Sequence, residues 1–157
     1  MISTIAAFTQ DDDGDWVARL SCGHGQHMRH RPMLEYRPWV LDAAQRAARI
    51  GTPIECPLCD RAEMPGDLVR TYVSDPLTCS KDASDFPSLL EVPPGQWYLI
   101  EVLDGQLKVY IPQLANPNFV LGPRTTVALP PSVTAMLEPR PGTAAIIESW
   151  SLPAFGK

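Results

Sequence analysis

Alternating apolar and polar residues dominate the second half of the chain and predict short β-strands. Leu107, Val109 and Ile111 alternate with Lys108 and Tyr110, which is typical of a strand with one buried face. Further strand-like segments follow at residues 118–121, 125–129, 134–138 and 144–151, separated by turns that contain proline or glycine. Short strands that recur in this way predict an antiparallel sandwich or barrel. We expect a jelly roll, with Asp104-Gly105 as the turn of a β-hairpin formed by residues 95–111.

The first third predicts a hairpin and one helix. Residues 2–8 form an apolar run, the acidic segment 11–15 contains the turn, and residues 16–20 return. Residues 43–50 favour a helix with Asp42 and Gln45 as a capping box and Gly51 after its end. This helix is expected to pack Trp39, Val40, Ala43 and Ala47 over the hairpin.

The two halves differ enough to suggest two domains. Residues 60–67 lack periodicity and contain Pro65-Gly66, a turn signal. We therefore predict a module at residues 1–66 and a β-barrel domain at residues 67–157. The predicted fold is mainly β: a small α+β module followed by an antiparallel jelly-roll barrel.

Cysteine and histidine spacing in the first domain predicts a metal site. Cys22 and His24 form a C-x-H pair, and Cys56 and Cys59 form a C-x-x-C pair. Such pairs supply the thiolates and the imidazole that tetrahedral Zn²⁺ prefers. His27 is the alternative to His24 as the nitrogen ligand. A unit this small usually needs such help to fold, so we expect the zinc to be structural.

Composition narrows the function classes. The 157 residues include 45% hydrophobic and 20% charged residues, and their net charge is −5. This charge makes nucleic acid an unlikely partner for the surface as a whole. The chain has no apolar run of membrane-spanning length and no leader-like start, so we expect a cytoplasmic protein without membrane contact. Cysteines with metal-type spacing also favour a reducing compartment.

An arginine-rich segment, residues 19–49, contrasts with this acidic balance. It contains Arg19, Arg29, Arg31, Arg37, Arg46 and Arg49 against only Glu35 and Asp42. Guanidinium groups bind carboxylates and phosphates through paired donors. One interpretation is an anion site, or a second shell around the metal, made of His27, His30, Arg29 and Arg37. The other is a solvated face whose arginines pair with the acidic hairpin turn.

The N-terminal motif resembles a small bacterial domain family of unknown function. The resemblance covers residues 1–62, and it is carried by Trp16-Val17-Ala18, Leu20-Ser21-Cys22-Gly23-His24-Gly25-Gln26-His27, Arg29-His30, Arg37-Pro38-Trp39 and Cys56 with Leu58-Cys59-Asp60. Because this motif includes all three histidines, it implies that His27 and His30 do more than lie on the surface, but it implies no activity.

The C-terminal part resembles the cupin-like domain of tellurite-resistance proteins over residues 68–153. The resemblance is carried by Gly95-Gln96-Trp97, residues 102–110, Pro130-Pro131 and Glu138-Pro139. Metal-binding cupins place histidines in these strands, whereas this chain has none after His30. A small ligand inside the barrel would be lined by Trp97, Glu101, Tyr110 and Trp150; alternatively, these aromatic residues belong to the core.

These features favour a zinc-binding two-domain protein with a binding, regulatory or stress-response accessory role, and a non-enzymatic one. The alternatives are a zinc enzyme that uses His27 or His30 beside the metal, and phosphate or nucleic-acid binding through the arginines from Arg29 to Arg49. Exposed strands of the barrel make a homodimer the expected oligomer.

Overall fold

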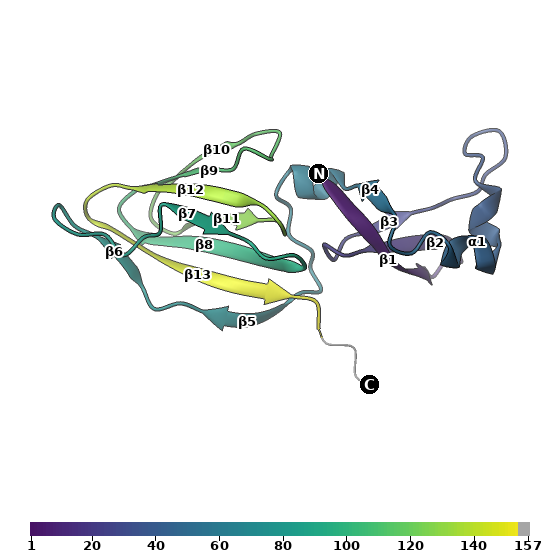
Figure 1. Cartoon of the computed structure of the whole chain (residues 1–157), viewed down its shortest axis with the longest axis horizontal. Helices are drawn as coiled ribbons and strands as arrows, with labels where there is room; N and C mark the ends of the chain where they lie inside the picture. Colours follow the sequence, from purple (N-terminus) through teal and green to yellow (C-terminus); the bar gives the residue numbers. More distant parts are fainter. Residues whose placement is uncertain (154–157) are drawn as a thin grey trace. The chain divides into compact units, whose positions relative to one another are not determined.

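A computed structural model describes residues 1–153 and confirms a mainly β protein with antiparallel sheets (Figure 1). The chain forms two compact units, the first from Ile2 to Cys56 and the second from Pro57 onward together with Met1. Within residues 1–153, no helix has the length and apolar character needed to span a bilayer.

The first unit is built on a four-stranded antiparallel sheet. Its strands are β1 (Ile2–Gln10), β2 (Trp16–Leu20), β3 (Gly25–His27) and β4 (Pro53–Glu55), in the order β3-β2-β1-β4. The predicted hairpin is confirmed, since β1 pairs with β2 with Phe8 opposite Ala18 and Gln10 opposite Trp16. Short β4 on the other side of β1 brings the segment before Cys56 next to the start of the chain.

The predicted helix is present but shorter than expected. A 3₁₀ turn, η1 (Pro38–Leu41), leads into α1 (Ala43–Ala47). The Asp42 side chain accepts a hydrogen bond of 2.8 Å from the backbone N–H of Gln45, so the predicted N-terminal cap is confirmed. The predicted C-terminal signal is wrong, because the C-cap is Ala48 and Gly51, with a φ of +82°, lies in the turn beyond it.

The expected packing of α1 through Ala43 and Ala47 is wrong. Both alanines are exposed, and α1 buries no residue. The helix is held instead by Arg46, whose guanidinium lies 3.5 Å from the centre of a Trp16 ring and donates a 2.6 Å hydrogen bond to the carbonyl of Val40. A methyl group is too short to reach the sheet from this helix, whereas a stacked guanidinium spans the gap.

The second unit is a sandwich of two antiparallel sheets (Figure 1). One sheet has the order β10 (Asn118–Leu121), β9 (Leu107–Tyr110), β12 (Thr134–Pro139) and β7 (Leu89–Glu91). The other has the order β11 (Thr125–Leu129), β8 (Gln96–Asp104), β13 (Thr143–Ser151) and β5 (Val69–Val73), and β6 (Leu77–Cys79) also pairs with β13. The strands predicted at residues 118–121 and 125–129 agree with β10 and β11 at both ends.

The core of the sandwich lies between the two sheets and is aliphatic. Ile100 and Val102 of β8 meet Leu107 and Val109 of β9 there, together with Ala135 of β12. Their alternation with exposed residues follows from the two-residue repeat of a strand. The inner faces are therefore filled by side chains of the sheets themselves.

The predicted hairpin at Asp104-Gly105 is wrong, because the strands on its two sides belong to different sheets. β8 pairs with β11 and β13, whereas β9 pairs with β10 and β12. Both strands bury an apolar face in the same core, so the turn carries the chain across the sandwich. Gly105 has a φ of +76°, and the Thr143 hydroxyl bridges the backbone of Gln106, accepting from its N–H at 3.1 Å and donating to its carbonyl at 2.8 Å.

This crossing predicts that Gly105 tolerates no side chain. A Cβ at this position would lie 2.6 Å from the Thr143 Cα, whereas Gly95, with a φ of +74°, has no atom within 4 Å of the corresponding point. Gly95→Ala should lower the free energy of unfolding by about 1 kcal/mol through the left-handed backbone alone. Gly105→Ala should add about 2 kcal/mol or more for the backbone clash. Urea unfolding of both variants measures the difference; equal losses would contradict the account.

Candidate metal centre

The structure brings together the four side chains predicted to ligate a metal. One donor atom from each of Cys22, His24, Cys56 and Cys59 lies within 4.8 Å of all the others. The four residues are between 2% and 6% exposed. This buried set of three sulfurs and one nitrogen is suited to hold a metal ion.

A tight turn after β2 positions the first two donors. The Leu20 carbonyl accepts a 2.9 Å hydrogen bond from the Gly23 N–H, and the Leu20 N–H donates to the His24 carbonyl at 2.8 Å. Gly23 has a φ of +95°, a conformation that glycine adopts without steric cost. The Cys22 N–H also donates to the Ser3 hydroxyl at 3.3 Å. Sequence spacing did not reveal this contribution of Ser3, since it depends on the pairing of β1 beside β2.

A second turn supplies the other two donors. Cys56 follows β4 directly, and the one-turn helix α2 (Pro57–Asp60) contains Cys59. Proline at the first position of α2 has its φ preset for a helix and loses no needed hydrogen bond. The Ala62 N–H donates to the Cys59 carbonyl at 3.0 Å, and Ala62 then leaves the turn with a φ of +53°. The two cysteines are thus held on one short, sharply curved segment.

The distances among three of the four donors agree with tetrahedral coordination. The sulfurs of Cys22 and Cys56 lie 3.8 Å apart. The Nδ1 atom of His24 lies 3.5 Å from the first sulfur and 3.3 Å from the second. Two sulfurs at about 2.3 Å from one tetrahedral zinc would be about 3.8 Å apart, and a sulfur and a nitrogen about 3.5 Å apart. A disulfide between these sulfurs would require about 2.05 Å. The spacing is that of ligands and not of a covalent bond.

The other two histidines lie outside this cluster. The Nδ1 atom of His27 is 3.3 Å from an Asp11 carboxylate oxygen, and its side chain is 49% exposed. His30 accepts a 3.0 Å hydrogen bond from the Arg37 N–H through Nδ1, and its ring packs edge-on against Tyr36. Of the two histidines considered as the nitrogen ligand, the structure therefore places His24, and not His27, among the sulfurs.

The arginine-rich segment is divided between several partners. Arg29 pairs with Asp15 at 2.6 Å, and Arg31 approaches the same carboxylate at 3.5 Å. These two arginines do what the solvated-face interpretation predicts, which is to neutralise the acidic hairpin turn. Arg37 lies 3.7 Å from Glu35.

The residues expected to line a barrel interior do not meet between the sheets. Because Ile100 and Val109 face the core, alternation directs Glu101 and Tyr110 to the outer faces of the two sheets. Trp97 is fully buried, and the Trp150 Nε1–H donates to Glu148 at 3.0 Å. The buried cluster between the two sheets is mainly aliphatic.

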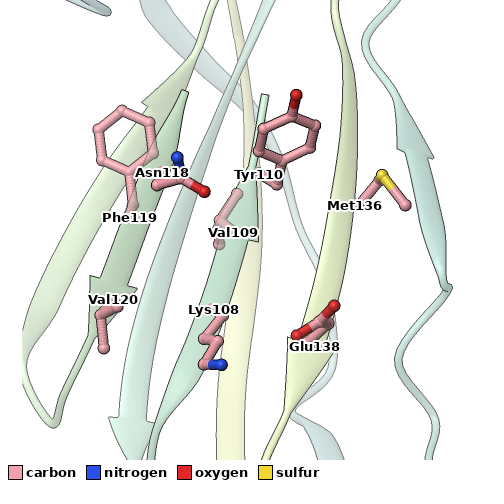
Figure 2. Close-up of a pocket in the computed structure, with 8 residues that line it drawn as sticks. All are labelled: Lys108, Val109, Tyr110, Asn118, Phe119, Val120, Met136 and Glu138. Atoms are coloured by element: carbon pink, nitrogen blue, oxygen red, sulfur yellow. The ribbon is translucent and has the colours of Figure 1, made fainter. Parts of the chain in front are cut away.

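A shallow hollow of about 360 Å³ lies instead on the outer face of the sheet that contains β9 (Figure 2). Tyr110 and Met136 are opposite each other in the β9–β12 register, as are Lys108 and Glu138. The hollow is lined by Lys108, Val109, Tyr110, Asn118, Phe119, Val120, Met136 and Glu138. It groups exposed apolar side chains with one charge of each sign.

Fold and cluster together define a mainly β chain with a buried Cys₃His metal-type site. Residues 6–63, which include all four donors, match the model of a family described as "Protein of unknown function (DUF3565)". The match supports an uncharacterised domain in the N-terminal part, as the sequence motif suggested. No curated protein matches the chain.

Among solved structures, the chain is similar to a protein from E. coli strain K12, a target of the Northeast Structural Genomics Consortium. The two are 16% identical, the match covers 58% of this chain and 97% of that chain, and the TM-score is 0.47. A likeness of that degree defines neither a shared fold nor a shared function.

Substitution distinguishes the two histidines. His24→Ala removes one of four donors and should weaken zinc binding by at least tenfold, whereas His27→Ala should leave it unchanged. His24→Cys supplies another thiolate and should retain the metal even if His24→Ala fails to fold. Competition with a chromophoric chelator measures the affinities. Loss of zinc from His27→Ala, with retention in His24→Ala, would overturn the assignment.

Proposed function

We propose that this chain is a zinc-binding protein whose metal is structural and holds the N-terminal unit in its folded form. The observation that carries the proposal is the buried set of donors from Cys22, His24, Cys56 and Cys59, all within 4.8 Å of one another. Thiolates with one imidazole are the ligand set that Zn²⁺ prefers, and harder cations such as Mg²⁺ prefer oxygen. Deprotonated thiols as ligands are also best maintained in a reducing cytoplasm, which we propose as the location.

The size of the apolar core supports a structural role. In the unit Ile2–Cys56 the buried apolar side chains other than cysteine are only Ile5, Val17, Ala18, Leu20, Met28 and Val40. Units of this size are marginal without a metal or disulfides. Zinc binding contributes about 10–16 kcal/mol of apparent free energy at pH 7 to small zinc-dependent domains. That amount is comparable to the typical stability of a whole domain, about 5–15 kcal/mol.

The number of donors favours a structural role over a catalytic one. Four protein ligands complete a tetrahedral shell, whereas catalytic zinc keeps one position for water or substrate. His27 and His30 are both engaged away from the cluster, by Asp11 and by the Arg37 backbone. We therefore propose a binding or regulatory role for the protein. The resemblance of the second unit to the cupin-like domain of tellurite-resistance proteins adds a stress-response accessory role to this proposal.

Removal of the metal tests the proposal. The full chain should contain one zinc, and a strong chelator under reducing conditions should unfold the residues from Ile2 to Cys56 while the sandwich remains folded. Amide NMR spectra follow both units separately, since each residue gives its own signal. Added Zn²⁺ should restore the lost signals. An N-terminal unit whose signals are unchanged after complete metal removal would contradict a structural role.

A further inference from the structure

A cleft of about 510 Å³ lies within the unit Ile2–Cys56, separate from the donor atoms of the metal cluster. Five segments of the unit contribute to it: β1, β3 with the residue after it, the segment around η1, the residue Arg49 after α1, and β4. It is lined by Ile5, Gln26, His27, Met28, Arg37, Trp39, Arg49, Thr52, Pro53, Ile54 and Glu55. This volume is in the range of sites for small organic ligands.

Arg49 presents unused hydrogen-bond donors in this cleft. Its guanidinium lies 3.9 Å from the centre of a Trp39 ring, and Phe8 packs edge-on against the same tryptophan. Stacking occupies the flat face of the guanidinium and leaves its N–H donors in the plane. Among residues 1–153, no carboxylate or carbonyl accepts a hydrogen bond from the Arg49 side chain. Trp39 thus orients a guanidinium whose donors are available to a ligand.

Arg37 is the second guanidinium of the cleft. Its nearest carboxylate, on Glu35, is 3.7 Å away, which is too long for a hydrogen bond, and both side chains are about 40% exposed. An exposed pair of this kind contributes little, so it competes weakly with a bound anion. The backbone of Arg37 is anchored by the hydrogen bond from its N–H to His30. The resemblance of the N-terminal motif to the bacterial domain family implies a role for His30. Its hydrogen bond to the Arg37 backbone is such a role.

The guanidinium groups of the neighbouring arginines already have partners. Arg29 and Arg31 both face Asp15, and Arg46 donates to the Val40 carbonyl while stacked on Trp16. Among the cleft residues, Glu55 carries the one carboxylate, against two guanidiniums. The cleft is therefore cationic within a chain of net charge −5.

Gln26 indicates that the ligand also carries a hydrogen-bond donor. Its Oε1 atom is buried and, among residues 1–153, is the one buried side-chain polar atom with no hydrogen-bond partner. An unsatisfied buried acceptor costs about 1–3 kcal/mol, and a donor on a ligand would recover that cost. A hydroxyl or amide N–H group supplies such a donor.

We propose that this cleft binds a small hydroxylated or amide-bearing organic anion, with a phosphate or carboxylate group bound by Arg37 and Arg49. Guanidinium groups match the oxygens of both anions through paired hydrogen bonds. The apolar side chains of Ile5, Pro53 and Ile54 contact the body of the ligand, and Gln26 accepts from its hydroxyl or amide group. The inference gives the proposed binding role a ligand class, and it rests on zinc to keep the unit folded.

Titration of the zinc-loaded full chain tests the inference. The probes are inorganic phosphate, ribose 5-phosphate and glycerate, followed by NMR of backbone amides and arginine side chains. Ribose 5-phosphate or glycerate should shift the signals of Arg37, Arg49 and Gln26, and should bind more tightly than inorganic phosphate, which has no organic body. The stronger of the two organic probes distinguishes a phosphate from a carboxylate site.

Matched arginine variants supply the controls. Arg49→Gln and Arg37→Gln should each weaken binding of the stronger probe by at least tenfold, and Arg49→Lys should fall between Arg49→Gln and the wild type. Arg31→Gln removes a charge from the same unit outside the cleft and should change the affinity less than twofold. Absence of localised shifts at 20 mM of every probe, roughly the upper limit for a specific weak site, would overturn the inference. So would equal weakening by Arg31→Gln, because it would indicate diffuse attraction to the whole arginine-rich segment.

Zinc content, measured on every sample, separates this inference from the structural role of the metal. Zinc-loaded, folded protein that binds no probe would overturn the cleft alone. Folded protein without metal that binds ribose 5-phosphate or glycerate through Arg37 and Arg49 would support the cleft and overturn the zinc proposal.

Discussion

The convergence of three sulfurs and one imidazole nitrogen is the constraint on which the N-terminal unit depends. Cys22 and His24 follow the hairpin, while Cys56 and Cys59 come more than thirty residues later in sequence. The donors of Cys22, His24 and Cys56 lie 3.3–3.8 Å from one another and gain little from direct contact, whereas a shared cation would convert their proximity into binding free energy. The cluster thereby closes a long loop whose own apolar core is sparse.

The two units are stabilised by different interactions. The sandwich buries the aliphatic faces of its two sheets against each other. The first unit combines the cluster with arginines stacked on tryptophans, Arg46 on Trp16 and Arg49 on Trp39. A stacked guanidinium keeps its in-plane donors, so the contact of Arg49 with Trp39 also places a cationic group in the cleft. Arg49 and Trp39 thus belong both to the packing of the first unit and to the lining of the candidate cleft.

Local signals could be predicted from the sequence, whereas contacts between distant segments could not. Strand alternation located β10 and β11, the C-x-H and C-x-x-C spacing identified the residues of the cluster, and the Asp42 cap located the start of α1. The hairpin prediction at Asp104-Gly105 was wrong because turn residues indicate the local backbone conformation. They do not indicate which sheet the next strand joins. Gln26 belongs to the N-terminal motif and Arg49 to the arginine-rich segment, but only the folded sheet places the two residues in one cleft.

X-ray absorption at the zinc edge of the purified full chain tests the central claim most directly. The account predicts a first coordination shell of three sulfurs at about 2.3 Å and one nitrogen at about 2.0 Å. It also predicts one zinc per chain, with no ligand from solvent. A shell dominated by oxygen and nitrogen, or protein that folds with no metal at all, would contradict it.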